Sequence, residues 1–332
     1  MSTARFPVPR VSRRTFLRRT GLWTGGTLAA SAFGVPAMAS ERELPRRTLG
    51  RTGESVTVFT LGTAPCGHSR HFSARQIADC VDEALECGVN SIDTAPAYFN
   101  AEEGVGLALG ERRGDVFLAT KFHADSIAEA EESLAHSLQA LKTDYLDLLY
   151  LHDVGGYEAE ETLAGEGVFT WLVKQRQAGK VRFIGITGHS QAGKFLPYLE
   201  TGEVDAVLMT LNFADRYTYE FEELVLPLCR EQNVGVVAMK VFGGIQGGFP
   251  AYPGPRRPAL IAGEYLPGAL RYTLGLPGVA TASIGVYAPA EVRGTALMAS
   301  RYEPLTTTEQ ERLARVGRDL AAVWGEHFGP PA

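Results

Sequence analysis

Three apolar runs of the sequence each end on a side chain that can take part in proton chemistry: Asp93, Lys121 and His152. A tyrosine, Tyr98, lies five residues after Asp93. A carbonyl group that accepts a hydride develops negative charge on its oxygen, so it needs a proton donor and nearby positive charge. A free tyrosine, with a pKa of about 10, is a weak acid at neutral pH, but a neighbouring ammonium lowers that pKa. The sequence therefore predicts that Tyr98 donates the proton and that Lys121 makes the phenol more acidic. Asp93 is predicted to hold Lys121 in place. His152 is predicted to orient the carbonyl oxygen by a hydrogen bond.

Each of these four residues also has a structural interpretation when it is taken alone. An aspartate or a lysine at a strand end commonly forms an ion pair, and a histidine or a tyrosine can simply pack in the core. The four together, each placed after a predicted strand, favour a functional site.

The elements that must position these residues alternate between buried strands and amphipathic helices. Eight short apolar runs indicate strands that are covered on both faces. They lie near residues 59–63, 89–93, 116–121, 146–151, 181–187, 204–211, 234–240 and 280–285. Residues 47–58 indicate a small amino-terminal β-hairpin before the first of them.

Helical patterns separate these strands. The clearest covers residues 73–87, where Ser73 and Gln76 fit a capping box. Others are predicted near 101–111, 126–142, 159–179, 190–200, 219–232, 264–275, 289–299 and 308–325, the last beginning at Thr308 with Glu311 behind it. Eight such units favour a closed (β/α)₈ TIM barrel over a doubly wound sheet, because no GxGxxG motif follows an early strand.

Several segments of the chain resemble the aldo-keto reductase superfamily, over roughly residues 46–325. The segments are residues 47–53 (RTLGRTG), 88–98 (GVNSIDTAPAY), 119–122 (ATKF), 144–152 (DYLDLLYLH), 185–190 (GITGHS) and 243–248. The resemblance implies a (β/α)₈ barrel that binds NADP or NAD without a Rossmann motif. It also implies that Asp93, Tyr98, Lys121 and His152 form the catalytic tetrad, with Tyr98 as the general acid.

The same resemblance suggests where a dinucleotide binds. The expected residues are Thr187, Asn212, Lys240, Phe242, Gly243, Gly244 and Gly285. The family usually grips the nicotinamide amide with Ser, Asn and Gln. In this chain Thr187 can stand in for the Ser, whereas Gly188 and Leu208 stand at the places of the Asn and the Gln.

Other positions of the cofactor site also depart from the family pattern. Met239 stands at the place of the stacking aromatic residue, and Glu291 stands near the arginine that usually holds the 2′-phosphate. Three alternatives follow: use of NAD, use of NADP held by other groups such as Arg256, Arg257 or Arg293, or loss of redox use of the cofactor.

The first 39 residues are predicted to be a targeting segment rather than part of the fold. Residues 12–18 (SRRTFLR) resemble the twin-arginine export motif, an uncharged run follows, and residues 37–39 (AMA) fit a cleavage site. We therefore expect a signal peptide at 1–39, a barrel domain at 40–332, recognition by the twin-arginine export machinery, and a periplasmic or otherwise exported location. A disordered basic arm and an uncleaved membrane anchor are the alternatives.

Composition excludes other partner classes. The chain has 332 residues, and removing six arginines at the N-terminus changes the charge from 32 − 38 = −6 to 26 − 38 = −12. An acidic mature protein is not expected to bind nucleic acid. We expect no stable membrane span in the mature form, and without a CxxC pair the sequence predicts no metal site.

Three functions remain open on the sequence. The first is an exported NAD(P)-dependent oxidoreductase that reduces aldehydes and ketones, or oxidises the alcohols, acting on small polar and sugar-like substrates. The second is a non-redox lyase or epimerase that uses the same acid–base residues. The third is a non-enzymatic barrel that senses a ligand. A proline-rich stretch, residues 247–263, is expected to form a loop over the site.

Overall fold

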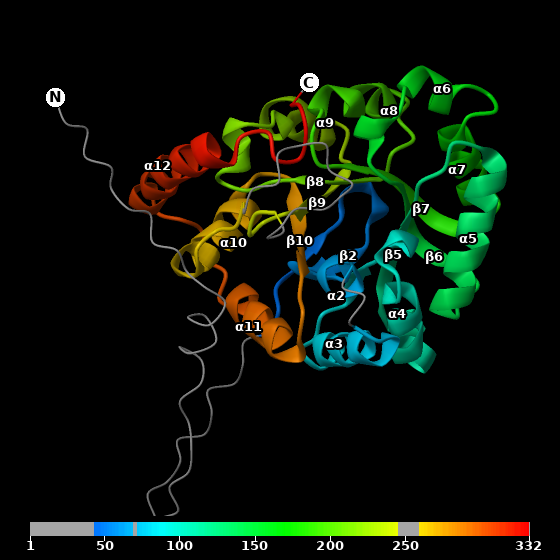
Figure 1. Cartoon of the computed structure of the whole chain (residues 1–332), viewed down its shortest axis with the longest axis horizontal. Coiled ribbons are helices and arrows are strands. Elements are labelled where there is room, and N and C mark those ends of the chain that lie inside the picture. The colour runs from blue at the N-terminus through cyan, green and yellow to red at the C-terminus, as the bar shows by residue number, and fades with distance from the viewer. Residues whose placement is uncertain (1–42, 69–71, 245–258, 332) are drawn as a thin grey trace, which may run out of the picture. The chain divides into compact units, whose positions relative to one another are not determined.

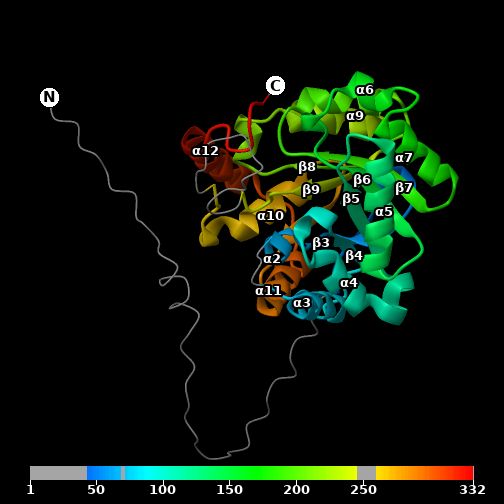
Figure 2. The same cartoon turned by 45° about the vertical axis from the view of Figure 1, so that its right-hand side comes forward.

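The computed structural model describes residues 43–68, 72–244 and 259–331. Within these residues eight parallel strands close into a barrel, and Figures 1 and 2 show the helices around the outside of the strands. The predicted (β/α)₈ barrel is confirmed. The predicted signal segment at 1–39 and residues 245–258 of the expected loop lie outside the described residues.

All eight predicted strands are present. They are β3 (Phe59–Gly62), β4 (Ser91–Asp93), β5 (Phe117–Phe122), β6 (Leu146–Leu151), β7 (Val181–Gly188), β8 (Ala206–Thr210), β9 (Gly235–Met239) and β10 (Val279–Gly285). Each strand pairs with its neighbours in chain order, and β10 closes the barrel on β3. All eight therefore present their carboxyl ends at the same mouth.

Alternate residues of each strand face the inside of the barrel, as the strand period of two requires. The interior is packed with apolar side chains that include Phe117, Leu148, Tyr150, Leu208 and Val237. The residues between them face outward and pack against the helices. The barrel is thus a filled core, which also holds a buried cluster of the hydroxyl groups of Thr60, Ser91 and Thr281.

The helices follow the predicted order, with local differences. They are α2 (Ala64–His68), α3 (Ala74–Glu86), α4 (Ala101–Leu109), α5 (Ile127–Leu141), α6 (Ala159–Leu163), α7 (Val168–Gln177), α8 (Leu196–Glu200), α9 (Leu226–Glu231), α10 (Leu266–Gly275), α11 (Pro289–Ser300) and α12 (Thr307–Trp324). The capping box of Ser73 and Gln76 on α3 is confirmed.

Three helix predictions need correction. The segment 159–179 forms two helices, α6 and α7, because the chain turns at residues 164–167, which contain two glycines. The segment 219–232 begins as a π-helical turn, Phe221–Val225, before α9. The last helix is capped by Thr306 with Glu309, not by Thr308 with Glu311, so it starts one residue earlier than predicted.

The predicted hairpin is confirmed as β1 (Arg46–Thr48) and β2 (Ser55–Thr57), which pair antiparallel. Its turn lies at the amino end of the barrel, where Leu49 joins the interior cluster and Arg51 donates its backbone N–H to Asn233 (2.6 Å). A side chain at Gly235 would collide with Leu49 (2.7 Å). The hairpin therefore fills the bottom of the barrel, at the end opposite the mouth.

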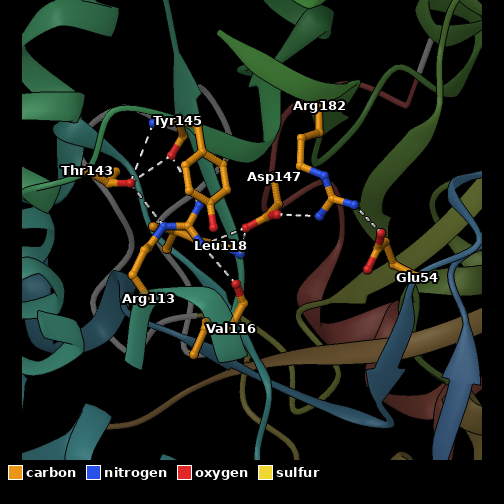
Figure 3. A network of polar contacts seen from close by, with 8 residues as sticks. All are labelled: Glu54, Arg113, Val116, Leu118, Thr143, Tyr145, Asp147 and Arg182. Carbon is orange, nitrogen blue, oxygen red and sulfur yellow. Dashed lines mark hydrogen bonds and ion pairs between the residues drawn. The ribbon is translucent and has the colours of Figure 1, made fainter. Parts of the chain in front are cut away.

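A buried carboxylate ties this amino end together (Figure 3). Asp147 on β6 accepts from the backbone N–H of Leu118 on β5 (2.9 Å) and pairs with Arg113 (2.8 Å) and with Arg182 on β7 (2.6 Å). Arg182 also contacts Glu54 of the hairpin. One side chain thus links three neighbouring strands and, through Arg182, the segment that covers the bottom of the barrel.

We predict that Asp147→Ala lowers the free energy of unfolding by about 3 kcal/mol, because it leaves the partly buried Arg113 without its carboxylate partner and the backbone N–H of Leu118 without its acceptor. Urea denaturation followed by circular dichroism measures this change. The matched control is Asp79→Ala, which removes an exposed pair with Arg75 and should change stability by less than about 0.5 kcal/mol. Equal effects of the two substitutions would show that Asp147 does not bear this role.

Candidate active site

The centre of the mouth is an ion pair between Asp93, at the end of β4, and Lys121 on β5. The Nζ of Lys121 donates to Asp93 Oδ1 (2.8 Å) and Oδ2 (2.7 Å) and to the backbone oxygen of Thr94 (2.8 Å). The Lys121 side chain is 1% exposed. An ammonium has three N–H groups, so Asp93 and Thr94 occupy all of them.

Tyr98 reaches this pair from the loop after β4. A 3₁₀ turn, Pro96–Tyr98, carries it, and its backbone N–H donates to Ala95 (3.0 Å). The loop packs against α2, where a side chain at Gly67 would meet Tyr98 Cβ at 2.7 Å. Tyr98 is buried, and the Nζ of Lys121 lies 5.0 Å from the centre of its ring.

His152 completes the group at the end of β6. Its ring meets that of Tyr98 edge-on, with centroids 6.2 Å apart and planes at 84°. Its backbone N–H donates to Phe122 on β5 (2.8 Å), which fixes the height of the histidine relative to Lys121. The structure therefore brings together all four residues that the sequence singled out.

The protonation of these groups differs in one respect from the sequence prediction. Burial raises the pKa of the Tyr98 phenol well above its usual value, and the charges of Asp93 and Asp153 raise it further. The sequence analysis predicted that Lys121 lowers the pKa of Tyr98. The difference arises because Tyr98 is shut off from water and because Asp93 offsets the charge of Lys121. The phenol therefore keeps its proton.

The other members are also held in defined states. Burial raises the pKa of Asp93 and lowers that of Lys121, and each charge opposes the shift of the other. Burial, with the charges of Lys121 and His189, lowers the pKa of His152 well below its usual value. His152 is thus a neutral imidazole, which can still donate one hydrogen bond.

Of the residues expected to bind a dinucleotide, Asn212 is occupied by the protein itself. Its Oδ1 accepts from Ala214 (2.9 Å) and Asp215 (2.8 Å), and its Nδ2 donates to Asp215 (2.7 Å) and to the backbone oxygen of Lys240 (3.0 Å). These four bonds use every hydrogen-bonding position of the amide. Asn212 therefore ties the end of β8 to the end of β9.

Lys240 and Thr187 are two further residues of the expected dinucleotide site. Lys240 follows β9 with a positive φ of 59°. Burial, opposed in part by Asp215, lowers its pKa to about 8. Thr187 on β7 is fully buried, and its Oγ1 accepts from the backbone N–H of Asp153 (3.0 Å).

The expected glycines and Phe242 have packing roles in the described structure. Side chains at Gly243 and Gly285 would collide with Ala259 and with Pro65 respectively. Gly244 lies against His327, which a side chain there would meet at 3.3 Å, and Phe242 is packed into two apolar clusters. Gly243 and Gly285 are therefore required by close packing.

Sequence reasoning missed the carboxyl-terminal segment, residues 325–329, which we call the C-terminal strap. His327 bonds to Asp215 (2.8 Å), and the backbone N–H of Phe328 donates to the hydroxyl of Tyr219 (2.8 Å). The ring of Phe328 is buried, 5.5 Å from the ring of His189 and 5.6 Å from the Nζ of Lys240. Helix periodicity ends before this segment, so no sequence pattern pointed to it.

Sequence reasoning also missed His189 and Asp153. The Nδ1 of His189 lies 3.9 Å from Asp153 Oδ1, and both residues act on His152. Asp153 directly follows His152, and His189 directly follows Gly188. This adjacency to residues of the predicted site was the one signal in the sequence.

Comparison with known proteins agrees with the fold. Residues 59–250 match the model of the aldo/keto reductase family. The chain belongs to the aldo/keto reductase family. It is 30% identical over 255 residues to an NADH-specific methylglyoxal reductase of Escherichia coli, a match that covers 67% of this chain and 72% of that protein.

Two further proteins are similar to this chain. The L-galactose dehydrogenase of Arabidopsis thaliana is 31% identical over 209 residues, which cover 58% of this chain and 63% of the plant protein. The chain thus matches less than two thirds of that relative. The holo form of an aldo-keto reductase from Bacillus halodurans superposes with a TM-score of 0.64 at 26% identity, covering 82% of this chain and 96% of the other.

Proposed function

We propose that this aldo/keto reductase is an exported, NAD(P)-linked oxidoreductase that interconverts small aldehydes or ketones and the corresponding alcohols. The observation that carries the proposal is the cluster of Tyr98, Lys121, Asp93 and His152 at the mouth of a barrel of this family. Tyr98 is the general acid in the direction of reduction.

A nicotinamide dinucleotide, when bound at this mouth, would supply the hydride that reduces the carbonyl carbon. Tyr98 gives its proton to the carbonyl oxygen, so that an alcohol results. Lys121 cannot leave Asp93 without breaking bonds to both carboxylate oxygens, so it acts as a fixed positive charge beside the developing oxyanion. Neutral His152 donates a hydrogen bond that fixes the direction of the oxygen.

Polar side chains at the mouth are available to hold a dinucleotide. Thr187 lies on the inward face of β7, and the hydroxyl of Thr210, at the end of β8, is buried with no hydrogen-bond partner among the described residues. A buried hydroxyl of this kind is expected where a ligand completes the bonding. Thr187 and Lys240 are the predicted cofactor residues that remain in our proposal.

The groups near α11 favour NAD over NADP. Glu291, in the first turn of α11, accepts from the backbone N–H of Tyr287 (2.8 Å), and a carboxylate there repels a 2′-phosphate. Arg293 is paired with Glu83, while Arg256 and Arg257 lie outside the described residues. The NADH-specific relative in Escherichia coli supports the same preference.

The substrate proposed is a small polar carbonyl compound or the matching alcohol. The C-terminal strap buries Phe328 beside His189 and Lys240, which restricts the room at this side of the mouth. Relatives named for methylglyoxal and L-galactose support small and sugar-like substrates.

Export is proposed on the amino-terminal sequence alone. Arg13 and Arg14 lie in the segment that resembles a twin-arginine motif. Because that route carries folded proteins, the barrel can bind a dinucleotide before export and retain it, with a second substrate regenerating it. In the described residues no helix is long and apolar enough to cross a membrane.

We predict that Tyr98→Phe lowers kcat by roughly 10²- to 10⁴-fold, because the proton donor is lost. The measurement is steady-state oxidation of NADH or NADPH with a panel of small aldehydes, together with titration of dinucleotide binding, which should be retained. Tyr145→Phe is the matched control, since Tyr145 stacks on Arg113 at the opposite end of the barrel. Unchanged activity of Tyr98→Phe would remove Tyr98 from the mechanism, and product formed without any dinucleotide would favour a lyase or epimerase.

We predict that kcat for reduction is independent of pH from about pH 7 to about pH 9. Because the pKa of His152 is lowered, His152 is neutral throughout this pH range. Because the pKa of Tyr98 is raised, Tyr98 stays protonated throughout the same range. The assay uses saturating dinucleotide, because Lys240, with a pKa of about 8, changes its charge within the range. A bell-shaped profile centred in this range would contradict these protonation states.

We predict that replacing both Arg13 and Arg14 with lysine keeps the full-length protein in the cytoplasm, while the parent chain reaches the periplasm in shortened form. Cell fractionation and mass spectrometry of the amino terminus measure this. The purified exported protein should also release a nicotinamide dinucleotide on denaturation. Equal distribution of the two proteins would overturn the proposed export route.

A further inference from the structure

A buried carboxylate outside the barrel wall has no part in the proton chemistry described above. Glu102 lies in the first turn of α4 and is 1% exposed. Its Oε1 accepts from the hydroxyl of Thr120 on β5 (2.6 Å), and its Oε2 lies 3.7 Å from Nδ1 of His136, a largely exposed residue. Thr120 is fully buried. Burying a carboxylate costs stability, so its presence between a helix and a strand points to a role beyond packing.

Each end of this hydrogen bond lies next to a residue of the candidate active site. Thr120 directly precedes Lys121 on β5, and side chains of consecutive strand residues point to opposite faces. Lys121 therefore faces the mouth, while Thr120 faces α4. Glu102 is the fourth residue after Tyr98 along the chain. The bond between Glu102 and Thr120 thus joins the segment that carries the phenol to the strand that carries the ammonium.

The backbone between Tyr98 and α4 is short and strained. The 3₁₀ turn that ends at Tyr98 is followed by Phe99, with a φ of 47° and a ψ of −107°, and then by Asn100, the residue before the helix. A residue other than glycine holds such a conformation only where the surrounding contacts impose it. A movement at the start of α4 is therefore passed on to Tyr98, because the two connecting residues have little freedom to absorb it.

Close packing holds α4 against its neighbouring helices. A side chain at Gly104 would collide with Ile77 on α3, and one at Gly106 would collide with the backbone of Ala140 on α5. Such apolar contacts fix the spacing between helices but are non-directional. A hydrogen bond to a carboxylate is short and directional. The bond from Thr120 therefore sets the height of α4 relative to β5.

We propose that Glu102 is a positioning residue for the general acid. Its hydrogen bond from Thr120 holds the phenol of Tyr98 in the place, beside the buried ammonium, from which it gives its proton to the substrate. This role requires an acceptor at position 102 and a donor at position 120, and it does not depend on the charge of the carboxylate. The inference rests on the proposed function, because it concerns the step in which Tyr98 gives up its proton.

The test uses substitutions that separate the hydrogen bond from shape and from charge. Thr120→Val removes the hydroxyl and keeps the shape of the side chain, whereas Thr120→Ser keeps the hydroxyl. Glu102→Ala removes the acceptor, whereas Glu102→Gln keeps an acceptor oxygen without the charge. Steady-state reduction of small aldehydes is measured on the purified full-length protein with NADH and NADPH, at a temperature at which circular dichroism shows every variant to be folded.

Loss of the bond should lower kcat and leave KM nearly unchanged. Thr120→Val and Glu102→Ala should each reduce kcat about tenfold, because a misplacement of about 1 Å near the reacting groups can cost roughly a hundredfold. KM for the aldehyde and the dissociation constant of the dinucleotide should stay within about twofold of the parent values, since neither ligand touches the bond. Thr120→Ser and Glu102→Gln, which keep the bond, should have a kcat within about twofold of the parent value.

The double variant, Thr120→Val with Glu102→Ala, shows whether the two side chains act through one bond. If they do, the double variant should lose about the same tenfold as either single variant. Independent effects would multiply to about a hundredfold, and that result would overturn the inference.

The matched control for a purely structural effect is Thr162→Val. It removes another buried threonine hydroxyl, which is hydrogen-bonded to the hydroxyl of Tyr198 (2.6 Å) in the helical layer. Both valine variants should lower Tm by roughly 2 to 5 °C, and only Thr120→Val should lower kcat. An unchanged kcat in Thr120→Val overturns the inference while the proposed function stands. If the parent reduces no aldehyde with either dinucleotide, both are overturned.

Discussion

The bond between Lys121 and Asp93 is the interaction on which the mouth of the barrel depends. A charge that is taken out of water must be paired and fully hydrogen-bonded, and here one carboxylate and one backbone carbonyl occupy all three N–H groups of the ammonium. The pair joins β4 to β5 and sets the height at which Tyr98 and His152 meet it. Because the ammonium has no donor left over, it serves as a fixed charge, and proton transfer is assigned to the phenol.

Much of the fold was readable from the sequence, for identifiable reasons. Strands buried on both faces appear as short apolar runs, such as residues 234–239, and this signal does not depend on knowing the partners. The capping box of α3 is likewise local. Helix α2, the turn between α6 and α7 and the π-helical turn before α9 were not predicted, because packing against the barrel decides them rather than local propensity.

The site divides in the same way. Asp93, Lys121 and His152 were found because a barrel gathers the ends of its strands, so that position along the chain implies position in space. The upward shift of the Tyr98 pKa was not predicted, since it depends on how completely the loop after β4 and α2 exclude water from the phenol. The hydrogen bonds by which Asn212 ties β8 to β9 were not foreseen either. The hydroxyl of Thr210 is conspicuous only once its neighbours are known to leave it unsatisfied.

The C-terminal strap bears on the order in which the protein becomes competent during synthesis. Ribosomes make the amino end first, yet the wall of the mouth beside Lys240 and His189 is built from His327 and Phe328. A nascent chain can assemble all eight strands before this wall exists. The mouth therefore acquires its final form only once residues 327 and 328 have been made and have packed beside Asp215, His189 and Lys240.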